Sequence, residues 1–121
     1  MMCPMKALSI RQPLAHLIAE GVKTIENRTW RTSYRGPLLI HAGTRWYDEP
    51  VGEIEKRHGI AIPRDLALGG IVGVADLVDI VDRSDDPYFV GPFGWVLANA
   101  RALPFHALRG RLGVFSIARL D

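Results

Sequence analysis

The sequence is short of cysteine and of long hydrophobic runs. Cys3 is the only cysteine among 121 residues, so no disulfide can form within the chain. No apolar stretch reaches the ~18 to 20 residues of a membrane-spanning helix, because Asp76, Asp79 and Asp82 interrupt the most hydrophobic region. The opening MMCPMKAL also lacks the basic segment and apolar run of a secretory signal. These absences predict a soluble, cytoplasmic protein without a membrane partner.

Motifs of common enzyme folds are missing as well. The chain has no phosphate-binding glycine loop ending in lysine, no dinucleotide-binding glycine fingerprint and no paired cysteines for zinc. No nucleophile elbow surrounds any of its serines, which are Ser9, Ser33, Ser84 and Ser116. The histidines are scattered, and none stands at metal-binding spacing from another. We therefore expect neither a bound metal nor a cofactor.

The residues that are present fit one globular domain with a single core, since 48% are hydrophobic and 23% are charged. We expect residues 5–121 to form this domain and residues 1–4 to be a frayed leader. The net charge of +2 permits an anionic partner without requiring one. Only three of the 15 basic residues are lysines, and the rest are arginines. Arginine suits phosphate recognition, but a bias in genome composition explains this preference equally well.

The hydrophobic pattern predicts a mainly β fold with two helices. A helix that opens at Pro13 and closes at Gly21 follows the first strand, and Asp48 is expected to cap a second helix that ends at Gly59. Gly73 predicts a bulge or tight bend in a long strand. The predicted strands cover residues 5–11, 23–30, 35–43, 71–82, 94–103 and 111–120. Because strands and helices do not alternate regularly, we expect a small, mixed or mostly antiparallel β-barrel of about six strands with two helical inserts.

Three charges are concentrated in GVKTIENRTW, residues 21–30. Glu26 and Arg28 share one face of the predicted strand, and Lys23 follows the first helix closely enough to reach Glu26. Spacing alone favours a solvated salt-bridge ladder on the barrel exterior, where such ion pairs contribute little to the stability of the fold. A functional site needs a second charged element nearby.

The segment SIRQP, residues 9–13, supplies such an element. Ser9 and Arg11 share a strand face, and Arg11 precedes a helix N-terminus that attracts anions. The two charged elements meet only if the second strand folds back beside the first. The alternative for Arg11 is an ordinary arginine on the surface. His41 closes the apolar run LLIH, where we expect it at the cleft rim or, alternatively, as a buried structural histidine.

Five segments together resemble the ASCH domain, the activating-signal-cointegrator homology family. In chain order they are LSIRQPLAHLI, GVKTIENRTW, GPLLIHAG, GGIVGVADLVD and GPFGWVLANARAL, and the resemblance as a whole extends from residue 5 to about residue 118. The most specific part is the pattern G-x-K-x-x-E-x-R, filled by Gly21, Lys23, Glu26 and Arg28, with the R-Q-P of residues 11–13 in support. This resemblance implies a PUA-like barrel, an RNA-binding architecture, with a cleft lined by both motifs.

The resemblance also implies an RNA or modified-nucleoside ligand, and some relatives are enzymes, among them an acetylcytidine amidohydrolase and proteins described as ribonucleases. In the amidohydrolase-like branch the motif lysine activates a threonine three positions later, but Lys23 is followed at that distance by Glu26. Leu14 stands where many relatives have an aromatic residue. Aromatic residues that remain available for base stacking are Trp30, Trp46, Tyr47 and Trp95, although tryptophan in a small barrel is more often core.

Two functions are consistent with these residues. In the first, the chain binds RNA or a nucleoside or nucleotide through Ser9, Arg11, Gln12, Arg28, His41 and Trp46. In the second, it hydrolyses a modified nucleoside or RNA, with Glu26 as general base and Lys23 stabilising negative charge. We favour binding, because the spacing provides charge but no evident nucleophile.

Overall fold

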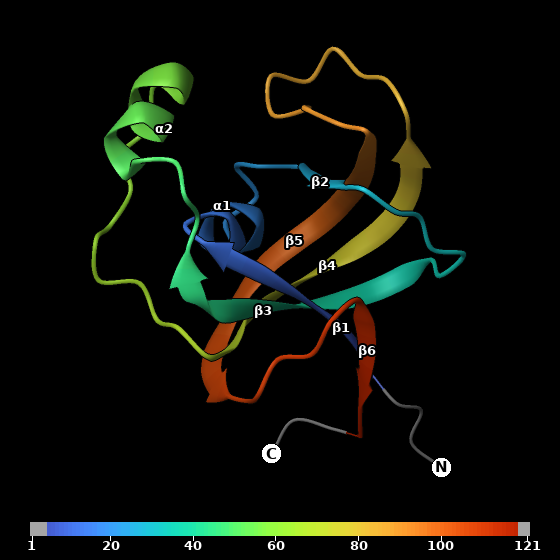
Figure 1. Ribbon diagram of the computed structural model, residues 1–121. Helices are drawn as coiled ribbons and strands as arrows, with labels where there is room; N and C mark the ends of the chain where they lie inside the picture. Colours follow the sequence, from blue (N-terminus) through green and yellow to red (C-terminus); the bar gives the residue numbers. More distant parts are fainter. Residues whose placement is uncertain (1–4, 119–121) are drawn as a thin grey trace.

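The computed structural model describes residues 5–118, so the leader expected at residues 1–4 lies outside the described residues. Within these described residues, six strands and two helices follow one another along the chain (Figure 1). They are β1 (Met5–Gln12), α1 (Leu14–Ala19), β2 (Ile25–Arg28), β3 (Gly36–Trp46), α2 (Val51–His58), β4 (Gly70–Val81), β5 (Phe93–Ala107) and β6 (Val114–Ile117). The prediction of a mainly β fold with about six strands and two helical inserts is confirmed.

All six strands form one mixed sheet with the order β2-β5-β4-β3-β1-β6. The pair β1–β3 is parallel, and the other four pairs are antiparallel. Within residues 5–118 no pairing joins the edge strands β2 and β6, so the barrel-like sheet is curved but not closed. The curvature nevertheless brings the ends of β1 and β3 towards β2, although other strands separate them in the sheet.

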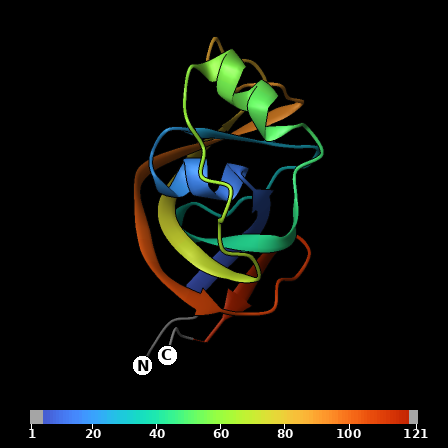
Figure 2. The same cartoon turned by 90° about the vertical axis from the view of Figure 1, so that its left-hand side faces the viewer.

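Helix α1 fills the hollow of the curved sheet. Figure 2 shows β4 and β5 curving around it, and its Ala15 and Ile18 pack in the main core with residues of β1, β3, β4 and β5. Six residues are too few for a stable isolated helix, so burial must maintain it. Gly73 permits this packing, because a Cβ there would lie 2.6 Å from the Ala19 Cβ. The register shift beside Gly73 confirms the predicted bulge.

Helix α2 lies outside the curved sheet in both views (Figures 1 and 2). Its buried Ile54 packs with Leu17 of α1 and Ile62 in a separate small cluster. The predicted end at Gly59 is confirmed, since this residue has a φ of 64°. The predicted cap at Asp48 is wrong: α2 begins at Val51 after Pro50, with no side-chain cap. No helix in the described part of the chain is long and apolar enough to cross a membrane.

Candidate functional site

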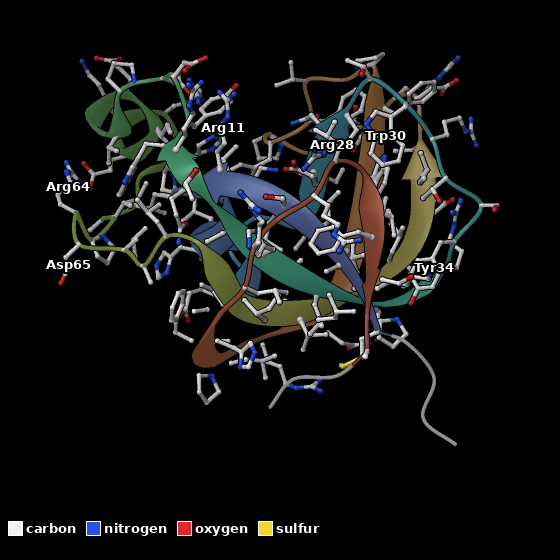
Figure 3. The ribbon with its side chains drawn as sticks, turned by 60° about the horizontal axis from the view of Figure 1, so that its bottom comes forward. Arg11, Arg28, Trp30, Tyr34, Arg64 and Asp65 are labelled. Atoms are coloured by element: carbon white, nitrogen blue, oxygen red, sulfur yellow. The ribbon has the colours of Figure 1, made fainter. Side chains whose placement is uncertain are left out.

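An open cleft of about 890 Å³ lies where β1, β2 and β3 meet the loop 109–113, and we call it the arginine cleft. Five arginines line the cleft. Among the described residues of its lining, Glu26 is the one acidic residue. The arginines come from four separate parts of the chain and are Arg11, Arg28, Arg45, Arg109 and Arg111. Figure 3 shows Arg11 and Arg28 on the upper side of the molecule, away from Arg64 at its left edge. The cleft is therefore strongly basic, although the whole chain has a net charge of only +2.

Glu26 is buried between two cations on one wall of this cleft. Its Oε1 lies 2.9 Å from Lys23 Nζ and its Oε2 lies 3.2 Å from Arg28 Nη2. The Lys23 ammonium also donates a hydrogen bond to the Ile25 carbonyl. Lys23 is 3% exposed and Glu26 is 5% exposed, so the interpretation as a solvated salt-bridge ladder is wrong. Buried charges are tolerated only when they are paired, and this trio keeps one positive charge in excess.

Arg28 links two strands that are not neighbours in the sheet. Its Nη2 donates a 2.8 Å hydrogen bond from β2 to the Ser9 carbonyl of β1, although β5, β4 and β3 lie between these two strands in the sheet order. Its Nε is buried and has no hydrogen-bond partner among the described residues. The structure thus brings the SIRQP segment and the β2 charges to one cleft, lined by Arg11, Glu26 and Arg28.

Lys23 lies behind Glu26 and lines a neighbouring cleft of about 580 Å³. There the His58 ring stacks on Tyr88 with centroids 3.8 Å apart. Burial, followed by the nearby Arg57 charge, lowers the pKa of His58 from its usual 6.5. Tyr47 is 43% exposed and lines both clefts, so it offers an aromatic face between them.

Ser9 and His41 are register partners on the parallel strands β1 and β3, and both line the arginine cleft. The Ser9 hydroxyl lies 3.0 Å from His41 Nδ1, and His41 Nε2 lies 2.6 Å from the Leu108 carbonyl oxygen. His41 is 1% exposed, so it is buried as in the structural alternative while also forming part of the cleft wall.

Two residues predicted to contact the ligand lie outside both clefts. Gln12 is 1% exposed, and its amide donates to the Ala67 carbonyl and accepts from the His16 backbone N–H. It therefore fixes the start of α1 against the loop before β4. Trp46 is half-buried at the end of β3 and lines neither cleft. Trp95 is fully buried, with Trp30 packed edge-on against it, which agrees with the core alternative for these two residues.

Sequence reasoning missed Arg45, Arg109 and Arg111, which supply most of the basic rim. The segment RGRLG, residues 109–113, carries a local signal, since two arginines flank a glycine. Nothing in the sequence indicates that this loop lies opposite β2. Asn27 was missed too: its amide donates to the Tyr88 carbonyl and accepts from the backbone N–H groups of residues 90 and 91, holding the loop before β5.

Comparison with known proteins identifies a family and two related proteins. The model of the ASCH domain family matches residues 8–89, which include most of β1 and all of β2 and β3 but not the loop 109–113. Activating signal cointegrator 1 of Mus musculus is 34% identical over 83 residues, which cover 63% of this chain and 14% of that protein. The Homo sapiens protein of the same name is 31% identical over 83 residues, with the same coverage. The matched region thus represents only a small part of these longer relatives.

Proposed function

Because this chain belongs to the ASCH domain family, we propose that it binds RNA or a nucleotide in the arginine cleft. The observation that supports this most directly is the charge of the lining, which contains five arginines and a single carboxylate among its described residues. That carboxylate is already engaged by Lys23 and Arg28, so it cancels little of the attraction for an incoming anion. The guanidinium fork matches phosphate oxygens in two-point contacts, and water-exposed arginines form such contacts without a large desolvation cost.

The shape and lining of the cleft also suit this ligand. A volume of about 890 Å³ is large enough for one or two nucleotides rather than a duplex groove. Tyr47 presents a partly exposed ring at the cleft, where a base can stack. We therefore expect single-stranded RNA or a nucleotide, with phosphates on Arg109 and Arg111 and a base near Tyr47.

The hydrolase alternative with Glu26 as general base has less support. A general base needs a free lone pair that faces the substrate. Both Glu26 oxygens lie within 3.2 Å of a cation, and the residue is 5% exposed. Lys23, the proposed charge stabiliser, lines the other cleft. These positions favour a structural and electrostatic role for the pair.

RNA binding can be tested by fluorescence anisotropy with a short labelled single strand at several salt concentrations. We expect the Arg109→Gln/Arg111→Gln double variant to bind more weakly, and its salt slope to fall by about 0.7 for each phosphate that is no longer neutralised. Arg101→Gln is the matched control, since Arg101 is exposed on β5 outside the cleft. Equally weakened binding in the Arg101 and the double variants, or no binding by the parent at low salt, would contradict the proposal.

A further inference from the structure

We propose that Ser9 is a nucleophile activated by His41, and that the arginine cleft cleaves carboxylic esters of compounds that also carry a negative charge. This activity goes beyond RNA or nucleotide binding and does not depend on it. It rests on the Ser9–His41–Leu108 chain of hydrogen bonds at the wall of the cleft. The side chains of Ser9 and His41 take no part in the ion pairs of Glu26, which are formed with Lys23 and Arg28.

The hydrogen bonds fix the direction of proton transfer. The Leu108 carbonyl oxygen, 2.6 Å from His41 Nε2, can only accept, so Nε2 carries a hydrogen. In the neutral ring Nδ1 is then an acceptor, and the Ser9 hydroxyl at 3.0 Å donates to it. Nucleophile, base and orienting group therefore stand in the order that serine-based acyl transfer requires, with a backbone carbonyl in place of the usual carboxylate.

Two glycines lie close to the Ser9 hydroxyl. A Cβ on Gly110 would lie 3.2 Å from Ser9 Oγ and 2.7 Å from His41 Cε1. A Cβ on Gly43 would lie 3.4 Å from the same hydroxyl. Any larger residue at position 110 would crowd the pair, so the loop 109–113 can approach Ser9 and His41 this closely only because this residue is glycine.

Arg28 provides positive charge beside the pair. One guanidinium nitrogen binds the Ser9 carbonyl, and the buried Nε has no partner among the described residues. The positive charge of this guanidinium favours the oxyanion that develops on an ester carbonyl attacked by Ser9, and the exposed arginines of the rim can hold the anionic part of the same substrate.

The step is balanced without an added cofactor. The Ser9 oxygen attacks the ester carbonyl carbon while its proton passes to His41 Nδ1. The carbon–oxygen bond of the leaving alcohol then breaks, and the alcohol oxygen takes the proton from Nδ1. Water repeats the sequence on the acyl-serine, which releases the carboxylic acid and restores the Ser9 hydroxyl.

The experiment is labelling with a fluorophosphonate, followed by peptide mass spectrometry. We expect the adduct on Ser9 in the parent and at an equal rate in the Ser33→Ala control, because Ser33 is an exposed loop residue. The rate should fall by about 10²-fold or more in His41→Gln, as expected for loss of a general base, and also in Gly110→Ala, where the new Cβ would press against the His41 ring and the Ser9 hydroxyl. An unlabelled Ser9 in a folded parent would overturn the proposal.

The substrate class is tested separately with two aryl esters. The parent should hydrolyse 4-nitrophenyl hydrogen succinate, which is anionic, with a higher kcat/KM than 4-nitrophenyl butyrate, which is neutral. A preference for the neutral ester would overturn this assignment. RNA anisotropy on the same preparations keeps the two proposals apart, since binding without labelling contradicts only the nucleophile, and labelling without binding contradicts only the RNA ligand.

Discussion

The single carboxylate of Glu26 pairs with two cations, the buried Lys23 and the half-buried Arg28. Among the described residues Lys23 has no comparable second acceptor for its charge, since its other hydrogen bond goes to the neutral Ile25 carbonyl. Arg28, by contrast, also donates a hydrogen bond to the Ser9 carbonyl, and its side chain is 22% exposed to water. The charge of Lys23 therefore depends on Glu26 far more than the charge of Arg28 does.

Glu26→Gln should lower the free energy of unfolding by about 3 to 5 kcal/mol, because it leaves a buried ammonium without a counter-charge. Urea denaturation at pH 7 measures this decrease. Asp48→Asn is the control: the Asp48 side chain is 91% exposed and lies 3.5 Å from Arg11, so its change should alter stability by less than about 0.5 kcal/mol. A similar small change for Glu26→Gln would contradict the buried pairing.

At the scale of secondary-structure elements, the packing of α1 on β4 depends on the absence of a side chain at Gly73. A Cβ there would meet the Ala19 Cβ at 2.6 Å and the Arg101 carbonyl oxygen at 2.9 Å. We expect Gly73→Ala to cost about 1 to 3 kcal/mol through overpacking, measured by urea denaturation. Gly52→Ala on α2 should instead stabilise by about 0.5 to 1 kcal/mol, because nothing lies within 4 Å of the new methyl group.

Helix α2 and the loop that follows it are joined by Glu55. The Arg64 guanidinium, and then the Ile62 backbone N–H, lower the pKa of this carboxyl from 4.5 to about 2. Since the folded pKa is the lower one, the contribution to stability is fully present above pH 4.5 and disappears as the pH falls towards 2. Glu55→Gln should therefore lower the urea midpoint at pH 7 but hardly at all near pH 2. Glu53→Gln, an exposed neighbour on α2, should show no such pH-dependent difference.

At the scale of the whole molecule, the arginine cleft is assembled from segments that are about a hundred residues apart in sequence. RNA that bridges them should slow amide hydrogen exchange in residues 9–11 and in residues 109–113 together, because both segments face the same ligand. Residues 60–68, in the loop between α2 and β4, should exchange at an unchanged rate. Protection confined to residues 60–68 would place the ligand elsewhere.

The sequence by itself determined the local structure and the family. Alternation and glycine positions located the strands and the ends of both helices to within a few residues, because these depend on neighbours along the chain. The predicted helix cap at Asp48 was wrong, because α2 begins only after Pro50. The pattern G-x-K-x-x-E-x-R likewise marked Lys23, Glu26 and Arg28 as a group, and the structure places them in contact.

Only the tertiary structure decided what surrounds those residues. Strand parity cannot tell a barrel exterior from its hollow, so the burial of Lys23 and Glu26 was not visible in the sequence. The meeting of Ser9 with His41 arises from parallel pairing of β1 with β3, and the loop 109–113 reaches the cleft through the curvature of the sheet. Such proximity depends on how distant segments pack, and packing is a property of the whole core rather than of any local pattern.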